Sequence, residues 1–130
     1  MRSEGVDLDA STPMAYNGEM SRRVEFLETS IFTRRVIHLL SDEEYRRLQE
    51  DLAQQPEAGV VMPGTGGLRK LRWGLKGRGK RGGARIIYYW AAQRQTILML
   101  FVFAKNERAD LTAAQCRILE REVKAYQGKG

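Results

Sequence analysis

The chain has 130 residues, a length that suits one domain with a single modest core. Its hydrophobic content of 42% and charged content of 29% are ordinary for a soluble globular protein. A single cysteine, Cys116, excludes an internal disulfide, and the longest apolar run, residues 97–104, is too short to cross a membrane as a helix. Residues 1–20 lack the apolar segment of a signal peptide, so a cytoplasmic protein is expected.

Positive charge is concentrated in the middle of the chain. Residues 58–106 contain ten Lys or Arg and no Asp or Glu, so the net charge of +6 divides into +10 there and −4 elsewhere. A block of like charge repels itself in the free protein, and a polyanion would relieve that repulsion. Nucleic acid is therefore the favoured partner. A solvated basic face without chemistry is the alternative.

The N-terminal segment and the first patterned residues differ in composition. Residues 1–21 mix polar residues, Gly and Pro with scattered acids and show no period. We therefore expect a disordered extension there, ahead of a single domain at residues 22–127. The domain would open with a short strand at residues 24–28, with Val24 and Phe26 on one face.

Capping signals predict two helices after this strand. Thr29 or Ser30 would cap a short helix that ends near Leu39. Ser41 and Glu44 have the spacing of a capping box, which would open a second helix to about Gln54.

The middle of the chain has the composition of strands separated by turns. Residues 60–62 form a short strand or an extended entry, and residues 68–75 alternate as a strand does. Residues 76–83 form a glycine-rich basic loop before the strongly β-prone residues 84–92. Residues 96–104 are apolar on both faces, which predicts a central strand.

A second capping box, Thr112 to Gln115, predicts a terminal helix to about Tyr126 with Cys116 on its inner stripe. The element order is then strand, two helices, a three-stranded antiparallel meander and a final helix. We expect an α+β fold in which two N-terminal helices and a C-terminal helix pack on a small, mostly antiparallel twisted sheet.

Two glycine-rich patterns fit phosphate-binding loops, but their context argues against nucleotide binding. Residues 74–80 fit G-x-x-x-x-G-K, yet Arg81 stands where a Ser or Thr must bind magnesium. Residues 77–82 fit G-x-G-x-x-G. Both motifs need a helix directly after the glycines, whereas a strand follows here. The glycines favour a hairpin tip that approaches a phosphate backbone closely.

No metal site or cofactor is expected. His38 is the one histidine, and no Cys or Asp cluster accompanies it. A structural role is favoured over catalysis both for His38 and for Cys116.

Alternation along the strands groups several basic residues. Lys70 and Arg72 share one face of their strand, and pairing with residues 84–92 brings Arg85 onto the same surface. Lys105 and Arg108, after the next strand, would close this patch.

The aromatic residues of the hairpin admit two roles. About half of them must be core, and any that lie beside the arginines could stack on unpaired bases. Alternation leaves open which face is which for Trp73, Tyr88, Tyr89 and Trp90.

Three blocks of the sequence, residues 64–73, 79–90 and 103–111, resemble the HigB-type branch of the RelE toxin superfamily, over about residues 24–126. The resemblance implies a RelE-like fold and the toxin of a bacterial toxin–antitoxin pair. Such toxins cleave messenger RNA in the ribosomal A site without a metal or other cofactor, through attack of a 2′-hydroxyl on the adjacent phosphate.

The resemblance also implies roles for single residues. Lys70 matches a catalytic lysine and Arg85 matches a phosphate-binding arginine, while residues 105–108 match a further basic catalytic stretch. Asn106 stands where RelE has arginine, and Leu111 stands in the region of its base-stacking tyrosine, so the assisting acid and the codon preference stay open.

The resulting hypothesis is a ribosome-dependent endoribonuclease. Its catalytic residues would be Lys70, Arg72, Arg85 and Lys105. Its residues for docking RNA or the ribosome would be Arg69, Lys76, Arg78, Lys80, Arg81 and Arg108. The implied partner is a HigA-like helix-turn-helix antitoxin, with operator DNA contacted only through it and no membrane involved. The alternatives are a ParE-like gyrase inhibitor and a non-catalytic RNA- or ribosome-binding module.

Overall fold

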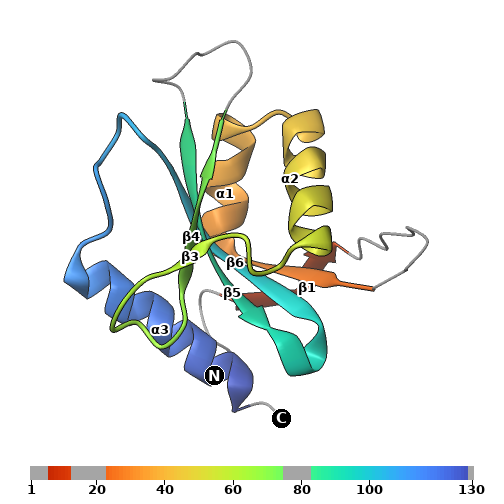
Figure 1. Cartoon of the computed structure of the whole chain (residues 1–130), viewed down its shortest axis with the longest axis vertical. Coiled ribbons are helices and arrows are strands. Elements are labelled where there is room, and N and C mark those ends of the chain that lie inside the picture. The colour runs from red at the N-terminus through yellow and green to blue at the C-terminus, as the bar shows by residue number, and fades with distance from the viewer. Residues whose placement is uncertain (1–5, 13–22, 75–82, 129–130) are drawn as a thin grey trace.

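A computed structural model describes residues 6–12, 23–74 and 83–128, with the backbone alone for residues 6–12. Within them the fold is α+β, with three α-helices and a six-stranded sheet (Figure 1). The strands are β1 (Val6–Thr12), β2 (Glu25–Thr29), β3 (Val60–Val61), β4 (Arg69–Trp73), β5 (Ala84–Ala91) and β6 (Thr96–Ala104). The helices are α1 (Ser30–Leu39), α2 (Asp42–Gln54) and α3 (Ala113–Gln127).

The sheet is mixed and has the strand order β1-β2-β6-β5-β4-β3. Strands β4, β5 and β6 form the expected antiparallel meander, and β2 runs parallel to β6. Seven of the nine β6 residues are buried, which confirms the prediction that this apolar strand is central. The α+β class and the mostly antiparallel pairing are confirmed.

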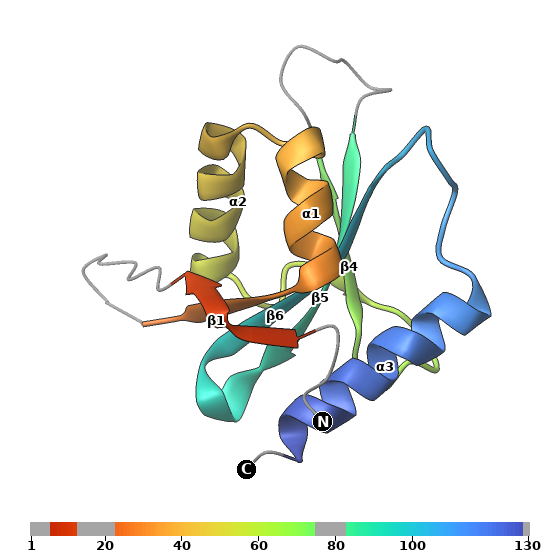
Figure 2. The same cartoon turned by 180° about the vertical axis from the view of Figure 1, so that it is seen from behind.

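Two apolar cores lie on opposite faces of the sheet. The first core joins α1 and α2 to the sheet through residues such as Phe32, Leu52 and Ile86. The second core joins α3 through residues such as Leu119 and Ile87. Figure 2, seen from behind, shows α1 and α2 together on one side and α3 on the other.

The predicted helix starts are confirmed by their capping bonds. The Thr29 hydroxyl accepts a hydrogen bond from the Phe32 amide (3.0 Å) at the start of α1. Both reciprocal bonds of the Ser41–Glu44 box are present at α2. The same holds for Thr112 and Gln115 at α3. Local signals of this kind need no tertiary information.

Strand β1 departs from the expectation of an unpatterned extension at residues 1–21. Residues 6–12 pair antiparallel with β2 and form one edge of the sheet (Figure 2). The apolar residues Val6, Leu8 and Ala10 alternate with polar ones, a period of two that fits a strand. Without β1, strand β2 would leave its outer backbone groups unpaired in the described sheet. The remaining residues of this segment lie outside the described ones.

A β-bulge in β6 was not predicted. Ile87 of β5 pairs with Phe101 and the next residue, Tyr88, pairs with Met99, so Leu100 is the extra residue. Its carbonyl accepts a hydrogen bond from the Thr29 hydroxyl (2.8 Å). Because of the bulge, Leu100 and Phe101 both pack in the second core.

A fully buried tyrosine fixes the turn between α2 and β3. The Tyr88 hydroxyl donates to the Pro56 carbonyl (2.7 Å) and accepts from the Gly59 amide (2.8 Å). Burial is the main cause that raises the pKa of Tyr88. The Arg69 guanidinium donates to the Gly59 carbonyl (2.7 Å) and to the Glu57 carbonyl (3.1 Å). The sheet and the turn after α2 are thereby joined through the hydrogen bonds of Tyr88 and Arg69.

Candidate functional site

The β4–β5 register brings the predicted basic residues to one face. Arg72 is the direct cross-strand partner of Arg85, and Lys70 pairs with Ile87. Their sequence neighbours Leu71 and Ile86 pack in the first core. Side chains alternate along a strand, so Lys70, Arg72 and Arg85 point to the face that carries the second core and α3. We call these three residues and Arg108 the basic face.

Asp110, in the loop after β6, lies on the basic face. Its Oδ2 accepts a hydrogen bond from Lys70 Nζ (2.7 Å), and its Oδ1 accepts one from the Leu111 amide (2.8 Å). The bond from Lys70 is the main cause that lowers the pKa of Asp110, and the charge of Arg85 acts in the same direction. Both cations therefore lie near enough to attract this carboxylate.

The guanidinium of Arg108 lies over two aromatic rings of β6. The Cζ atom of its guanidinium is 5.4 Å from the ring centroid of Phe101 and 5.8 Å from that of Phe103. Such cation–π contacts orient the guanidinium without consuming its hydrogen-bond donors. Its Nη2 donates to Glu107 (3.1 Å), while its buried Nε has no partner among the described residues. Arg108 thus lies near Phe103, the cross-strand partner of Arg85.

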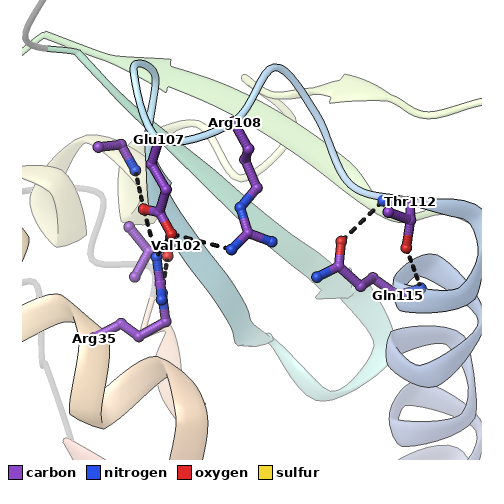
Figure 3. A network of polar contacts seen from close by, with 7 residues as sticks. Arg35, Val102, Glu107, Arg108, Thr112 and Gln115 are labelled. Atoms are coloured by element: carbon purple, nitrogen blue, oxygen red, sulfur yellow. Dashed lines mark hydrogen bonds and ion pairs between the residues drawn. The ribbon is translucent and has the colours of Figure 1, made fainter.

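Glu107 ties the start of this loop to α1 (Figure 3). Arg35 of α1 donates to Glu107 Oε1 (2.6 Å) and, through Nε, to the Val102 carbonyl of β6 (2.7 Å). The Ala104 amide also donates to Glu107 (3.1 Å). Partial burial works to raise the pKa of Glu107, but these bonds and that of Arg108 outweigh it, so the pKa is lowered.

Sequence reasoning missed Arg35, Glu107 and Asp110. Arg35 and Glu107 are 72 positions apart, so no local pattern joins them. One signal was present: Glu107 and Asp110 are the first acids after the acid-free residues 58–106. Acids that directly follow a basic block are candidates for its internal partners.

Other predicted site residues have different positions. Lys105 is exposed in the turn after β6, and its amide donates to the Gly83 carbonyl (2.9 Å) beside the start of β5. Arg69 alternates with Lys70, belongs to the opposite face and bonds the turn at Glu57 and Gly59, so the structure does not bring it to the basic face. The remaining predicted docking residues lie outside the described ones: Lys76, Arg78, Lys80 and Arg81.

The two cores show which face of the sheet each aromatic residue of the hairpin occupies. Tyr88 is fully buried in the first core, and Trp73 and Trp90 pack against it. Tyr89 lies on the α3 side, where its hydroxyl accepts from the Gln127 amide group (2.8 Å). On the side of the arginines, Phe101 is partly buried and Phe103 is fully buried, and both rings lie beneath Arg108.

No cluster of metal ligands is found among the described residues, where three or more His, Cys, Asp or Glu would have to meet. His38 is exposed at the end of α1. Cys116 is only partly buried, so its expected place on the inner stripe of α3 is met in part. Burial and the nearby charges of Asp110 and Glu120 raise the pKa of its thiol. Neither residue takes part in a recognisable reactive group.

The described helices include none with the length and apolar character needed to span a membrane. What the basic face offers is a group of cationic hydrogen-bond donors on one side of the sheet with an exposed carboxylate among them, an arrangement suited to a phosphate or another anion. No model of a known protein family matches the chain.

Proposed function

We propose that this chain is the toxin of a type II toxin–antitoxin pair, a metal-independent endoribonuclease that cuts messenger RNA in the ribosomal A site and so stops translation. The observation that carries the proposal is the convergence of Lys70, Arg72 and Arg85 on one face by strand register. The proposal also includes a RelE-like arrangement of the helices and strands.

The chemistry needs positive charge more than it needs an unusual nucleophile. Attack of a 2′-hydroxyl on the neighbouring phosphate places extra negative charge on the phosphoryl oxygens, and fixed guanidinium groups stabilise that charge. Arg72 and Arg85, opposite each other, are suited to hold two oxygens of one phosphate. Arg108 and Lys105 would bind the adjoining backbone.

Lys70 is proposed as the proton-transfer residue. It donates a hydrogen bond to Asp110, so it holds a proton in this arrangement. To act as the base, it would first release that proton to water, because the lowered pKa of Asp110 makes its carboxylate a poor proton acceptor. The neutral amine would then accept the proton of the attacking 2′-hydroxyl.

The proposed partners follow from the same function. A HigA-like helix-turn-helix antitoxin with acidic side chains would cover or distort the basic face. Ribosomal RNA would contact the toxin beside the message, and operator DNA would be reached only through the antitoxin. The proposed location is the cytoplasm, where ribosomes translate.

Primer extension on a reporter message tests the proposal. Wild-type protein and Arg85→Ala would each be induced briefly in cells with translating ribosomes. Arg34→Ala is the matched control, because Arg34 is exposed on α1, away from the basic face. We expect discrete in-frame breaks with wild type and Arg34→Ala, and none with Arg85→Ala. Intact message despite growth arrest would contradict the nuclease and direct attention to gyrase.

A non-catalytic RNA- or ribosome-binding module is the second candidate. The Lys70–Asp110 ion pair favours it, since a lysine engaged by a carboxylate serves as a charge rather than as a free base. In that case Lys70→Ala would weaken RNA binding by the loss of one phosphate contact, and message would stay intact with the wild type.

A further inference from the structure

The carboxylate of Asp110 occupies the position that suits a phosphate on the basic face. It bonds Lys70 Nζ at 2.7 Å and is attracted by Arg85. The candidate anion site therefore already holds an anion, supplied by the chain itself.

This carboxylate is held loosely. Its side chain is 47% exposed, and among the described residues its other oxygen bonds only the amide of the next residue, Leu111. Exposed ion pairs are weak, because water competes for both groups. A phosphate, which has more charge and more acceptor oxygens than a carboxylate, can replace it at Lys70.

The same loop is held firmly a few residues earlier. Glu107 is bonded by Arg35, by Arg108 and by the Ala104 amide (Figure 3). The loop thus has a fixed point at Glu107, and Asp110 can leave Lys70 without loss of the contacts that hold Arg108 on its aromatic surface.

We propose that Asp110 is an internal counter-ion that closes the anion site in the free protein and that an RNA phosphate displaces it. The inference rests on the proposed function and adds a step to it: Lys70 becomes available to RNA only when Asp110 departs. Apparent affinity is then reduced by the fraction of molecules in which the ion pair is closed.

Binding of an uncleavable RNA tests the displacement apart from any chemistry. The probe is a single-stranded RNA octamer that carries a 2′-O-methyl group on every ribose, so it has no attacking hydroxyl. Asp110→Asn is expected to bind it about two- to fivefold more tightly than wild type, the gain that corresponds to an exposed ion pair. Glu43→Gln, an equal charge change on exposed α2, controls for net charge and should stay close to wild type.

The Lys70→Met background separates displacement from a general field effect. If Asp110 acts by closing Lys70, Asp110→Asn adds little affinity to Lys70→Met. An equal gain in both backgrounds, or no gain in either, overturns the inference. Thermal unfolding of each variant establishes that it is folded before its affinity is compared.

The outcome is independent of whether the chain cuts RNA. Tighter binding by Asp110→Asn, lost in Lys70→Met, upholds displacement even where primer extension finds no breaks, and only the nuclease proposal then fails. Breaks in the message together with unchanged octamer binding uphold the nuclease and overturn displacement.

Discussion

Arg72 and Arg85 lie directly opposite each other across the β4–β5 pair, and within residues 23–74 and 83–128 neither forms an ion pair with a carboxylate. Like charges at directly opposed positions of a sheet destabilise it. The pairing thus works against folding, which is the pattern expected where a site binds an anion rather than where a sheet is merely stabilised.

Replacing one member of this pair should stabilise the fold. We expect Arg72→Gln to raise the free energy of unfolding by about 0.2–1 kcal/mol, the range of such cross-strand pairs, and to weaken RNA binding. Urea denaturation gives the first quantity. Arg121→Gln, an exposed arginine of α3, is the control and should leave stability nearly unchanged. A loss of stability in Arg72→Gln would show that repulsion between Arg72 and Arg85 does not destabilise the folded sheet.

Gly59 allows the close approach of Tyr88. A Cβ at Gly59 would lie 2.8 Å from Tyr88 Cε1 and 3.2 Å from Arg69 Cβ. Tyr88 is fully buried and cannot move away, so Gly59→Ala should destabilise by about 1–3 kcal/mol through overpacking. Gly74→Ala, whose Cβ would meet nothing within 4 Å, is the control for thermal unfolding. Equal melting temperatures for the two variants would show that the turn adapts.

Glu107 gives the stability of the fold a dependence on pH. Its pKa in the folded chain is below the unfolded value of 4.5, since Arg35, Ala104 and Arg108 outweigh the effect of burial. The stabilisation is therefore fully present above pH 4.5 and is lost as pH falls through the lower folded value. Denaturation at pH 7 and pH 3 should show a smaller loss of stability for Glu107→Gln than for wild type. An equal loss of stability between pH 7 and pH 3 in both proteins would show that Glu107 does not cause the pH dependence.

The predictable parts of this protein depended on neighbours in sequence. The Ser41–Glu44 box is local and predicted the start of a helix, and the alternation of Arg85, Ile86 and Ile87 is local and predicted a strand with Ile86 on the face opposite Arg85 and Ile87. The alternation also places Arg69 on the face opposite Lys70, and the structure agrees, since Arg69 bonds the turn at Glu57 and Gly59.

The parts that escaped prediction depended on distant residues. The bulge at Leu100 is stabilised by Thr29, 71 positions away, and Arg35 meets Glu107 across a similar separation. Asp110 reaches Lys70 only because the chain after β6 returns over the β4–β5 face. Composition identified the basic face, but its internal anion could be found only in three dimensions.

Arg85→Lys separates a catalytic site from a binding module. The substitution keeps the charge and removes the planar fork that can hold two oxygens of one phosphate. If Arg85 stabilises the transition state, single-turnover cleavage of ribosome-bound message should fall by about 10²-fold or more. Binding of the uncleavable octamer, which reports the ground state, should change by about threefold at most, because a lysine still contacts phosphate as a point charge. Arg34→Lys, on α1, should alter neither rate nor affinity. A parallel fall in rate and affinity would mean that Arg85 serves binding alone, since only an interaction stronger in the transition state than in the ground state accelerates the chemical step.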